Sequence, residues 1–131
     1  MKLPDNGIFT FGSNTAGRHG AGAANVAFKR FGAIPSQGEG IQGRSYAIPT
    51  KSRTLKTLSV GQIGSHVDRF ITFAKNNPNL LFFVTAIGTG LAFHEHEDMA
   101  NLFLNAPDNC VFDGRWKEYL PNKKYFDEEI I

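Results

Sequence analysis

Residues 12–24, with the sequence GSNTAGRHGAGAA, combine four glycines with side chains that bind anions or transfer protons. The Arg18 guanidinium can hold a phosphate through two parallel N–H donors, and His19 can act as an acid or a base near neutral pH. Glycines let main-chain amides approach a phosphate closely, because no Cβ atoms stand in the way. The segment therefore predicts either an anion-binding loop or a tight turn that Arg18 and His19 only decorate.

Two later segments carry further groups suited to the same chemistry. Residues 49–53, PTKSR, include Lys51, whose amine becomes nucleophilic in a pocket shielded from water and can otherwise neutralise a phosphate. Residues 87–93, IGTGLAF, form a second glycine-rich segment that can hold a diphosphate from the opposite side. The alternatives are a solvated lysine beside Arg53 and Lys56, and a second tight turn. Neither glycine segment has the spacing of a Walker A loop or of GxGxxG.

Other reactive side chains have simpler structural explanations. The run HEHED at residues 94–98 contains two histidines one residue apart, but without a third ligand this is a weak metal pattern. Its acidic residues favour the first turn of a helix, so we expect no metal site. Glu39 could activate a water, but we expect it in a turn. Cys110 is expected in the core, and so is Trp116, whose alternative role is to stack on an adenine.

The elements that would position these groups begin with an apolar strand at residues 8–11. Apolar residues then recur on one face of a helix that starts at residue 22 and ends near residue 32. Residues 33–44 have no periodicity and contain three glycines, so we expect a loop. Residues 45–48 predict a second strand, which Pro49 stops.

The second half begins with a capping box, in which Ser59 and Gln62 precede a helix. The expected buried stripe of that helix consists of Ile63, Val67, Phe70, Ile71 and Ala74. Residues 76–78 end it. We then expect a strand covered on both faces, a short helix, a strand and a last helix, at residues 80–86, 98–104, 109–112 and after Gly114.

This alternation predicts an α/β sandwich with a mostly parallel sheet, formed as one domain by residues 1–131. Ligands of such sheets bind beyond the carboxyl ends of the strands. Each of the three segments with anion-binding groups follows a predicted strand. We therefore expect all three to meet at one edge of the sheet.

The composition argues against several other classes of protein. A net charge of +2, from 14 basic and 12 acidic residues, is too small to suggest binding to nucleic acid or to a membrane surface. The single cysteine excludes an internal disulfide and fits a reducing cytosol. No apolar run approaches the roughly 20 residues that span a bilayer, and the first residues do not resemble a signal peptide. We expect a cytoplasmic protein.

In order and spacing, three stretches resemble the macrodomain superfamily of ADP-ribose binders: GSNTAGRHGAGAA, then QGEGIQGRSYAIPTK, then VTAIGTGLAF. The resemblance covers residues 7–104 and is greatest to small phage and bacterial macrodomain-like proteins and to the branch of DNA ADP-ribosyl glycohydrolase antitoxins. It implies a macrodomain-like three-layer sandwich. It also implies that the diphosphate and distal ribose of ADP-ribose contact Asn14, Gly20, Gly22, Ala23, Ile87, Gly88, Thr89, Gly90 and Leu91.

The resemblance implies a catalytic role for Lys51, which matches the lysine that the glycohydrolase branch associates with attack at the distal ribose. His19 is the second catalytic candidate, as an acid or a base. The sequence departs from the family pattern after the GxG loop, where related glycohydrolases carry an acidic residue and this chain has Ala92 and Phe93. Asp5 is the nearest candidate for the acidic residue that contacts adenine in the family.

The sequence therefore predicts a protein that binds ADP-ribose or an ADP-ribosylated substrate without a cofactor, and a candidate ADP-ribosyl glycohydrolase. A nucleic acid would be a partner only if it were ADP-ribosylated, and no membrane partner is expected. Two alternatives stay open. One is a protein that sequesters an ADP-ribose-type signal without catalysis, and the other is a phage structural or interaction protein that uses the fold without a ligand.

Overall fold

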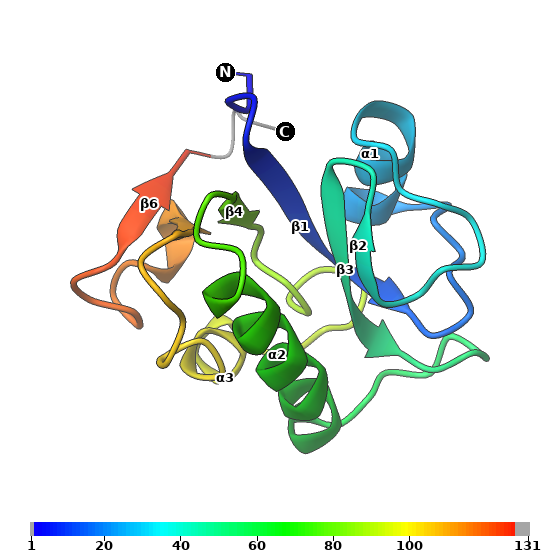
Figure 1. The fold of residues 1–131 in the computed structure, drawn as a ribbon. Coiled ribbons are helices and arrows are strands. Elements are labelled where there is room, and N and C mark those ends of the chain that lie inside the picture. Colours follow the sequence, from blue (N-terminus) through cyan, green and yellow to red (C-terminus); the bar gives the residue numbers. More distant parts are fainter. Residues whose placement is uncertain (1, 128–131) are drawn as a thin grey trace.

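The computed structural model describes residues 2–127, and residue 1 and residues 128–131 of the predicted domain lie outside the described part. A sheet lies between two helical layers (Figure 1). Its six strands follow the order β2-β3-β1-β4-β5-β6, and every neighbouring pair except β2–β3 is parallel. The predicted α/β sandwich with a mostly parallel sheet is therefore confirmed. The elements are β1 (Gly7–Asn14), α1 (Gly22–Arg30), β2 (Gly40–Gln42), β3 (Ser45–Lys51), α2 (Val60–Lys75), β4 (Leu81–Val84), α3 (His96–Asn101), β5 (Cys110–Asp113), the 3-10 turn η1 (Gly114–Trp116) and β6 (Lys124–Phe126).

The larger core lies between the sheet and the layer formed by α2 and α3. Phe70 of α2 is fully buried at its centre. Its ring packs edge-on against Tyr46, Phe82 and Phe103, with centroid distances of 5.1, 5.3 and 6.0 Å. Aromatic pairs in this arrangement add to the stabilisation from burial. This cluster fixes α2 against the middle of the sheet.

The smaller core lies on the opposite face, under α1. Phe9 of β1 stacks on Phe31, just after α1, with ring centroids 4.7 Å apart. Ala27 of α1 is fully buried, so the helix backbone approaches the sheet closely. The position of α1 therefore follows from contacts with β1, the strand that immediately precedes it.

Helix α2 forms as the sequence predicts. The Ser59 hydroxyl accepts a hydrogen bond from the Gln62 amide at 3.2 Å, and the Gln62 side-chain oxygen accepts one from the Ser59 amide at 2.9 Å. All five residues of the predicted stripe are buried. The capping box and the apolar period therefore determine where α2 starts and which face it buries.

Three predictions about the elements are wrong. Residues 33–44, expected as a loop, include β2, which pairs antiparallel with β3. Strand β3 does not stop at Pro49 but continues to Lys51. Strand β2 reaches no further than Ala47, so the missing N–H of Pro49 breaks no pairing with β2. The region after Gly114 contains η1 and β6 instead of a last helix, and β6 extends the sheet beside β5.

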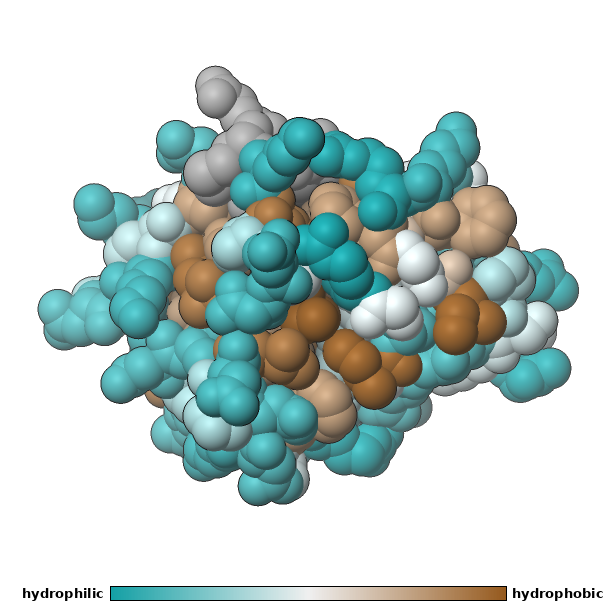
Figure 2. All heavy atoms as spheres, turned by 45° about the horizontal axis from the view of Figure 1, so that its top comes forward, coloured by the Kyte–Doolittle hydropathy of each residue, from teal (hydrophilic) through white to brown (hydrophobic). Residues whose placement is uncertain are grey.

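The molecular surface mixes polar and apolar groups. Figure 2 shows one face on which hydrophobic residues, from the middle toward the right of the view, lie among hydrophilic ones. Folded proteins expose much apolar surface, so these groups by themselves indicate no partner. Within residues 2–127, no helix combines the length and the apolar character that crossing a bilayer requires.

Candidate functional site

A cavity of about 420 Å³ lies where β1, β3 and β4 end. Its walls come from the segments that follow these strands, so the prediction that they meet at one edge of the sheet is confirmed. Two residues predicted for the site, His19 and the adenine candidate Asp5, do not line it. The predicted residues that do are Asn14, Arg18, Gly20, Gly22, Ala23, Lys51, Ile87, Gly88, Thr89, Gly90 and Leu91.

The segment after β1 is folded by its own side chains. The buried Asn14 side chain donates a hydrogen bond to the Arg18 carbonyl at 2.9 Å and accepts one from the Arg18 amide at 3.0 Å. At Gly17, φ is +71° and a Cβ would lie 2.4 Å from the Gln37 nitrogen, so only glycine fits there. Asn14 and Gly17 thus shape the loop. For residues 14–18, this agrees with the alternative prediction of a tight turn.

Helix α1 begins at the wall of the cavity without a cap. Its N-cap residue, Ala21, offers no side-chain acceptor, and its first turn contains no acidic residue. Ala21, Gly22, Ala23 and Ala24 all line the cavity. The amides of a helix N-terminus carry a partial positive charge and bind anions. Because α2 has a complete capping box and α1 has none, the open end of α1 suits an anionic ligand.

Lys51 ends β3 and is half-buried at the cavity wall. Its backbone is held on both sides, because its carbonyl accepts the Thr15 amide at 3.0 Å and a bridge joins it to Thr57. Among residues 2–127, the Lys51 ammonium has no hydrogen bond or ion pair. The side chain can therefore neutralise a phosphate or, once desolvated, act as a nucleophile.

The segment after β4 forms a closed loop across the cavity. The His94 amide donates to the Gly88 carbonyl at 2.8 Å, and the Thr89 hydroxyl donates to the Ala86 carbonyl at 2.7 Å. The His94 ring also contacts the Leu58 carbonyl, at 2.7 Å from Nε2. These bonds fix the loop independently of any ligand, so its wall of the cavity is preformed.

Two residues that line the cavity, Leu55 and Arg115, lie outside the three segments that the sequence analysis singled out. Arg115 follows β5, which ends at the same edge of the sheet as β1, β3 and β4. The rule that located the other segments would have located Arg115 as well. It was missed because the region after Gly114 was expected to form a helix.

His19 points away from the cavity. Its Nε2 atom lies 2.9 Å from the Ile34 carbonyl and 3.2 Å from Gln42 Oε1, and its ring packs edge-on against Phe11. Arg18 and Gly20, on either side of it in the sequence, line the cavity. The side chain of His19 therefore extends from the opposite side of the backbone. The structure therefore does not support His19 as a group that acts on a ligand in this cavity.

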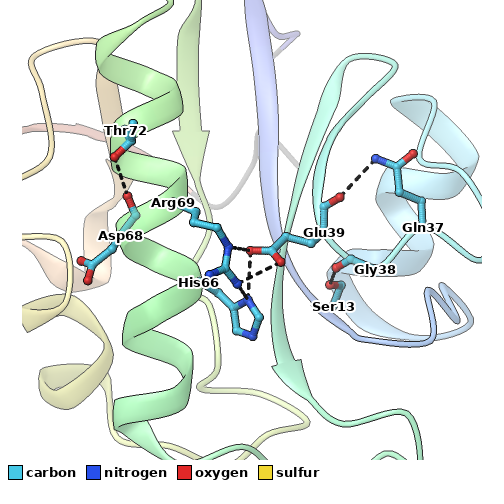
Figure 3. A network of polar contacts seen from close by, with 8 residues as sticks. All are labelled: Ser13, Gln37, Gly38, Glu39, His66, Asp68, Arg69 and Thr72. Atoms are coloured by element: carbon cyan, nitrogen blue, oxygen red, sulfur yellow. Dashed lines mark hydrogen bonds and ion pairs between the residues drawn. The ribbon is translucent and has the colours of Figure 1, made fainter.

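Glu39 takes part in a network that sequence reasoning did not anticipate (Figure 3). Its carboxylate reaches across to α2, where it lies 2.9 Å from His66 Nδ1 and accepts from Arg69 Nε at 2.9 Å. Partial burial raises the pKa of Glu39, but the hydrogen bonds from Arg69 and His66 outweigh it and hold the pKa below its ordinary value. None of these residues lines the cavity, so Glu39 ties the segment before β2 to α2.

Glu39→Gln should make the free energy of unfolding less dependent on pH in the acidic range. The pKa of Glu39 is lowered in the folded state, so the network stabilises the protein fully above the ordinary value of 4.5 and loses this effect as the pH falls through the lowered value. Because the pairing is partly exposed, we expect a loss of no more than about 1 kcal/mol at pH 7. Urea unfolding at pH 7 and pH 3 measures it. A difference from the wild type that stays equally large at pH 3 would argue against an ionic contribution.

The other residues considered from the sequence, Cys110, Trp116 and Asp5, lie outside the cavity. Cys110 is buried, and burial raises the pKa of its thiol to about 12 although Lys123 opposes the shift, so the thiol stays protonated as expected for a packing role. Trp116 is fully buried in the larger core, also as expected. Asp5 is exposed and does not line the cavity.

The run HEHED also has the structural role that the sequence indicates. Glu97 and Asp98 lie in the first turn of α3. His96 Nδ1 accepts a hydrogen bond from the Trp116 indole at 3.1 Å. Nowhere in the described part of the chain do three His, Cys, Asp or Glu side chains gather as a metal site would require.

The electrostatic character of the cavity follows from these observations. Arg18, Lys51 and Arg115 line it together with the open end of α1, whereas no Asp or Glu among residues 2–127 does. Such a site attracts anions.

The sequence matches no protein-family model, and neither a curated protein nor a solved structure matches it.

Proposed function

We propose that the cavity binds ADP-ribose or a closely related nucleotide derivative. The observation that carries the proposal is the uncapped N-terminus of α1, which lines the same cavity as Lys51 and the 87–91 loop. Main-chain amides and a lysine without a counter-ion among the described residues are together suited to a diphosphate. The volume of about 420 Å³ lies within the range of small-molecule sites. The resemblance of the three segments to macrodomains supports ADP-ribose as the specific ligand.

Hydrolysis of an ADP-ribosyl linkage is the reaction that this site would perform if it is catalytic. Because no carboxylate from residues 2–127 lines the cavity, the deprotonated Lys51 amine would then attack the anomeric carbon of the distal ribose. The glycosidic bond to the acceptor would break, the acceptor would leave with the proton that the amine gives up, and water would then cleave the lysine–ribose bond to release ADP-ribose. The same absence of a carboxylate favours simple binding over catalysis. We therefore propose binding as the primary function and Lys51 as the residue on which any turnover depends.

Titration of the protein with ADP-ribose by calorimetry tests the proposal. Lys51→Ala should weaken binding by about ten- to a hundredfold, because a charged hydrogen bond contributes about 1.5–3 kcal/mol. Lys56→Ala is the matched control, since Lys56 lies in the same basic segment and does not line the cavity. Absence of both heat and a melting shift at millimolar ADP-ribose would refute the proposal and favour an interaction protein.

An assay with ADP-ribosylated protein or DNA separates an enzyme from a binder. If Lys51→Ala abolishes release of ADP-ribose but retains affinity for it, Lys51 is a catalytic nucleophile. If the variant loses affinity and the wild type releases nothing, Lys51 is a phosphate contact and the protein is a binder.

Gly20→Ala should weaken ADP-ribose binding without destabilising the fold. A Cβ at Gly20 would meet no heavy atom within 4 Å, so the added methyl group would occupy space at the cavity wall. We expect at least about a tenfold loss of affinity, equivalent to about 1.4 kcal/mol. Gly61→Ala is the control, because Gly61 is equally open but lies on α2 outside the cavity. Unchanged affinity in Gly20→Ala would mean that the ligand does not approach this part of the loop.

A further inference from the structure

The part of the cavity wall between Arg18 and α1 rests on one buried side chain, that of His19. Only 7% of the surface of His19 is exposed, whereas the residues on either side of it are exposed. Asn14 holds the backbone of Arg18, but no backbone amide of residues 19–21 donates a hydrogen bond to another of residues 2–127. The position of residues 19–21 at the cavity therefore depends on how the His19 ring is packed.

The contacts of His19 fit a neutral ring that carries its proton on Nε2. This atom lies 2.9 Å from the Ile34 carbonyl and 3.2 Å from Gln42 Oε1, and both oxygens can only accept a hydrogen bond. A neutral imidazole has one N–H, so Nδ1 is unprotonated. Nδ1 is buried without a hydrogen-bond partner among the described residues, and the Phe11 ring packs edge-on against the imidazole. A second proton would therefore place a charged N–H without an acceptor in the interior.

No carboxylate from residues 2–127 contacts His19. Strands β1 and β2, which pack against the ring, contain no titratable side chain. The acidic residue between α1 and β2 is Glu39, and its carboxylate is bonded to α2. The charged residues of the loop itself and of α1 are all cationic, namely Arg18, Lys29 and Arg30. An imidazolium at this position would thus have neither an acceptor for Nδ1 nor an opposite charge to offset it.

We propose that His19 makes anion binding in the cavity sensitive to acid. In acid the ring takes up a second proton at Nδ1 and moves out to water, where an unpaired charge is far more stable. Residues 19–21 then lose their anchor, and the wall at the start of α1 is released. The inference rests on the proposed function and extends it, because it gives the same site a form of regulation. Positive charge gained near an anion site ordinarily strengthens binding, whereas this release weakens it.

Calorimetric titration with ADP-ribose at pH 8 and at pH 5.5 tests the inference. An imidazole in water is mostly protonated at the lower pH. The apparent affinity falls with the fraction of molecules whose wall is in place, so the wild type should bind about three- to tenfold more weakly at pH 5.5 than at pH 8. His19→Gln retains an N–H at the end of the side chain but does not titrate, so its two affinities should agree within about twofold.

His94→Gln is the matched control, because it removes a histidine from the loop after β4, whose ring is bonded to the Leu58 carbonyl instead. It should leave the ratio of the two affinities as in the wild type. A wild type that binds equally well or better at pH 5.5 would overturn the inference but not the proposed function. A loss that persists in His19→Gln, or vanishes in His94→Gln, would overturn it as well by assigning the effect to another group. A wild type that does not bind at pH 8 would overturn the proposed function, and this inference with it.

Nitrogen NMR of the histidine rings in the wild type gives a test that needs no variant. Without ligand, His19 should be neutral with its proton on Nε2 at pH 8 and protonated at pH 5.5. Because the coupling is reciprocal, saturating ADP-ribose should move this protonation to lower pH. Melting temperatures verify that the protein is folded at both pH values. A His19 ring that stays neutral at pH 5.5 in the folded protein would show that the anchor holds in acid, and the inference would be wrong.

Discussion

Gly88→Ala is expected to destabilise the protein by about 2–5 kcal/mol and to abolish binding in the cavity. Gly88 is buried with φ at +79°, and a Cβ on it would lie 2.6 Å from the Met99 sulfur. The left-handed conformation costs a residue with a Cβ about 1–2 kcal/mol. The overlap adds about 1–3 kcal/mol, because the buried Met99 side chain has to change its position within a packed core. A shift of the loop that relieves the overlap would displace the wall that faces α1.

Gly90→Ala provides the matched control for this prediction. Gly90 lies in the same loop and lines the cavity, but its φ is not positive and a Cβ on it would meet nothing within 4 Å. We expect a change in stability within about 0.5 kcal/mol. Urea unfolding of both variants measures the contrast in stability. A Gly88→Ala protein as stable as Gly90→Ala would show that the loop is not constrained as described.

Phe70→Ala is expected to cost about 3–5 kcal/mol and to lower the melting temperature by more than about 10 °C. Phe70 is fully buried and contacts aromatic rings from β3, β4 and the segment that follows α3. Its removal leaves a cavity that these rigid rings cannot fill by small movements. The loss therefore includes both apolar burial and contacts between the layers.

Phe28→Ala is the matched control for the core variant. Phe28 is also a helical phenylalanine, but 46% of its surface is exposed on α1. Replacing it should change stability by no more than about 0.5 kcal/mol. Thermal unfolding of the two variants is the measurement. If Phe70→Ala lost less than about 1 kcal/mol, the larger core would have to repack in a way that the observed contacts do not suggest.

The parts of the fold that could be predicted from sequence are those with a strong local signal. Helix α2 has a capping box and an apolar stripe from Ile63 to Ala74, and both occur where they were expected. The continuous apolar run before residue 87 similarly indicated a buried parallel strand, β4. In these segments local preference and tertiary packing favour the same structure.

The short elements could not be predicted, because their stability depends on neighbours distant in sequence. Strands β2 and β6 have three residues each and form only by pairing with β3 and β5. Pro49 is normally a sign that a strand ends, yet β3 continues beyond it, because β2 has already ended at this position and only β1 still pairs with β3 there. Neither fact can be read from a window of local sequence.

The candidate site was predictable to the extent that topology determines it. Parallel strands bring their carboxyl ends to one edge, which placed Lys51 and the glycine segments together. Side-chain direction is not determined by topology, and for this reason His19 was assigned to the cavity although it points away from it. The pairing of Glu39 with His66 and Arg69 joins residues about thirty positions apart and has no local signature.

The two outermost strands of the sheet have a consequence for behaviour at high concentration. Within residues 2–127, each of them has only three residues, which is too short to offer a long template to a second molecule. On the β2 side, Pro49 also interrupts the donors of β3 beyond the point where β2 ends. The short outer strands and Pro49 therefore disfavour the addition of strands from a second molecule, the step with which many fibrillar aggregates begin.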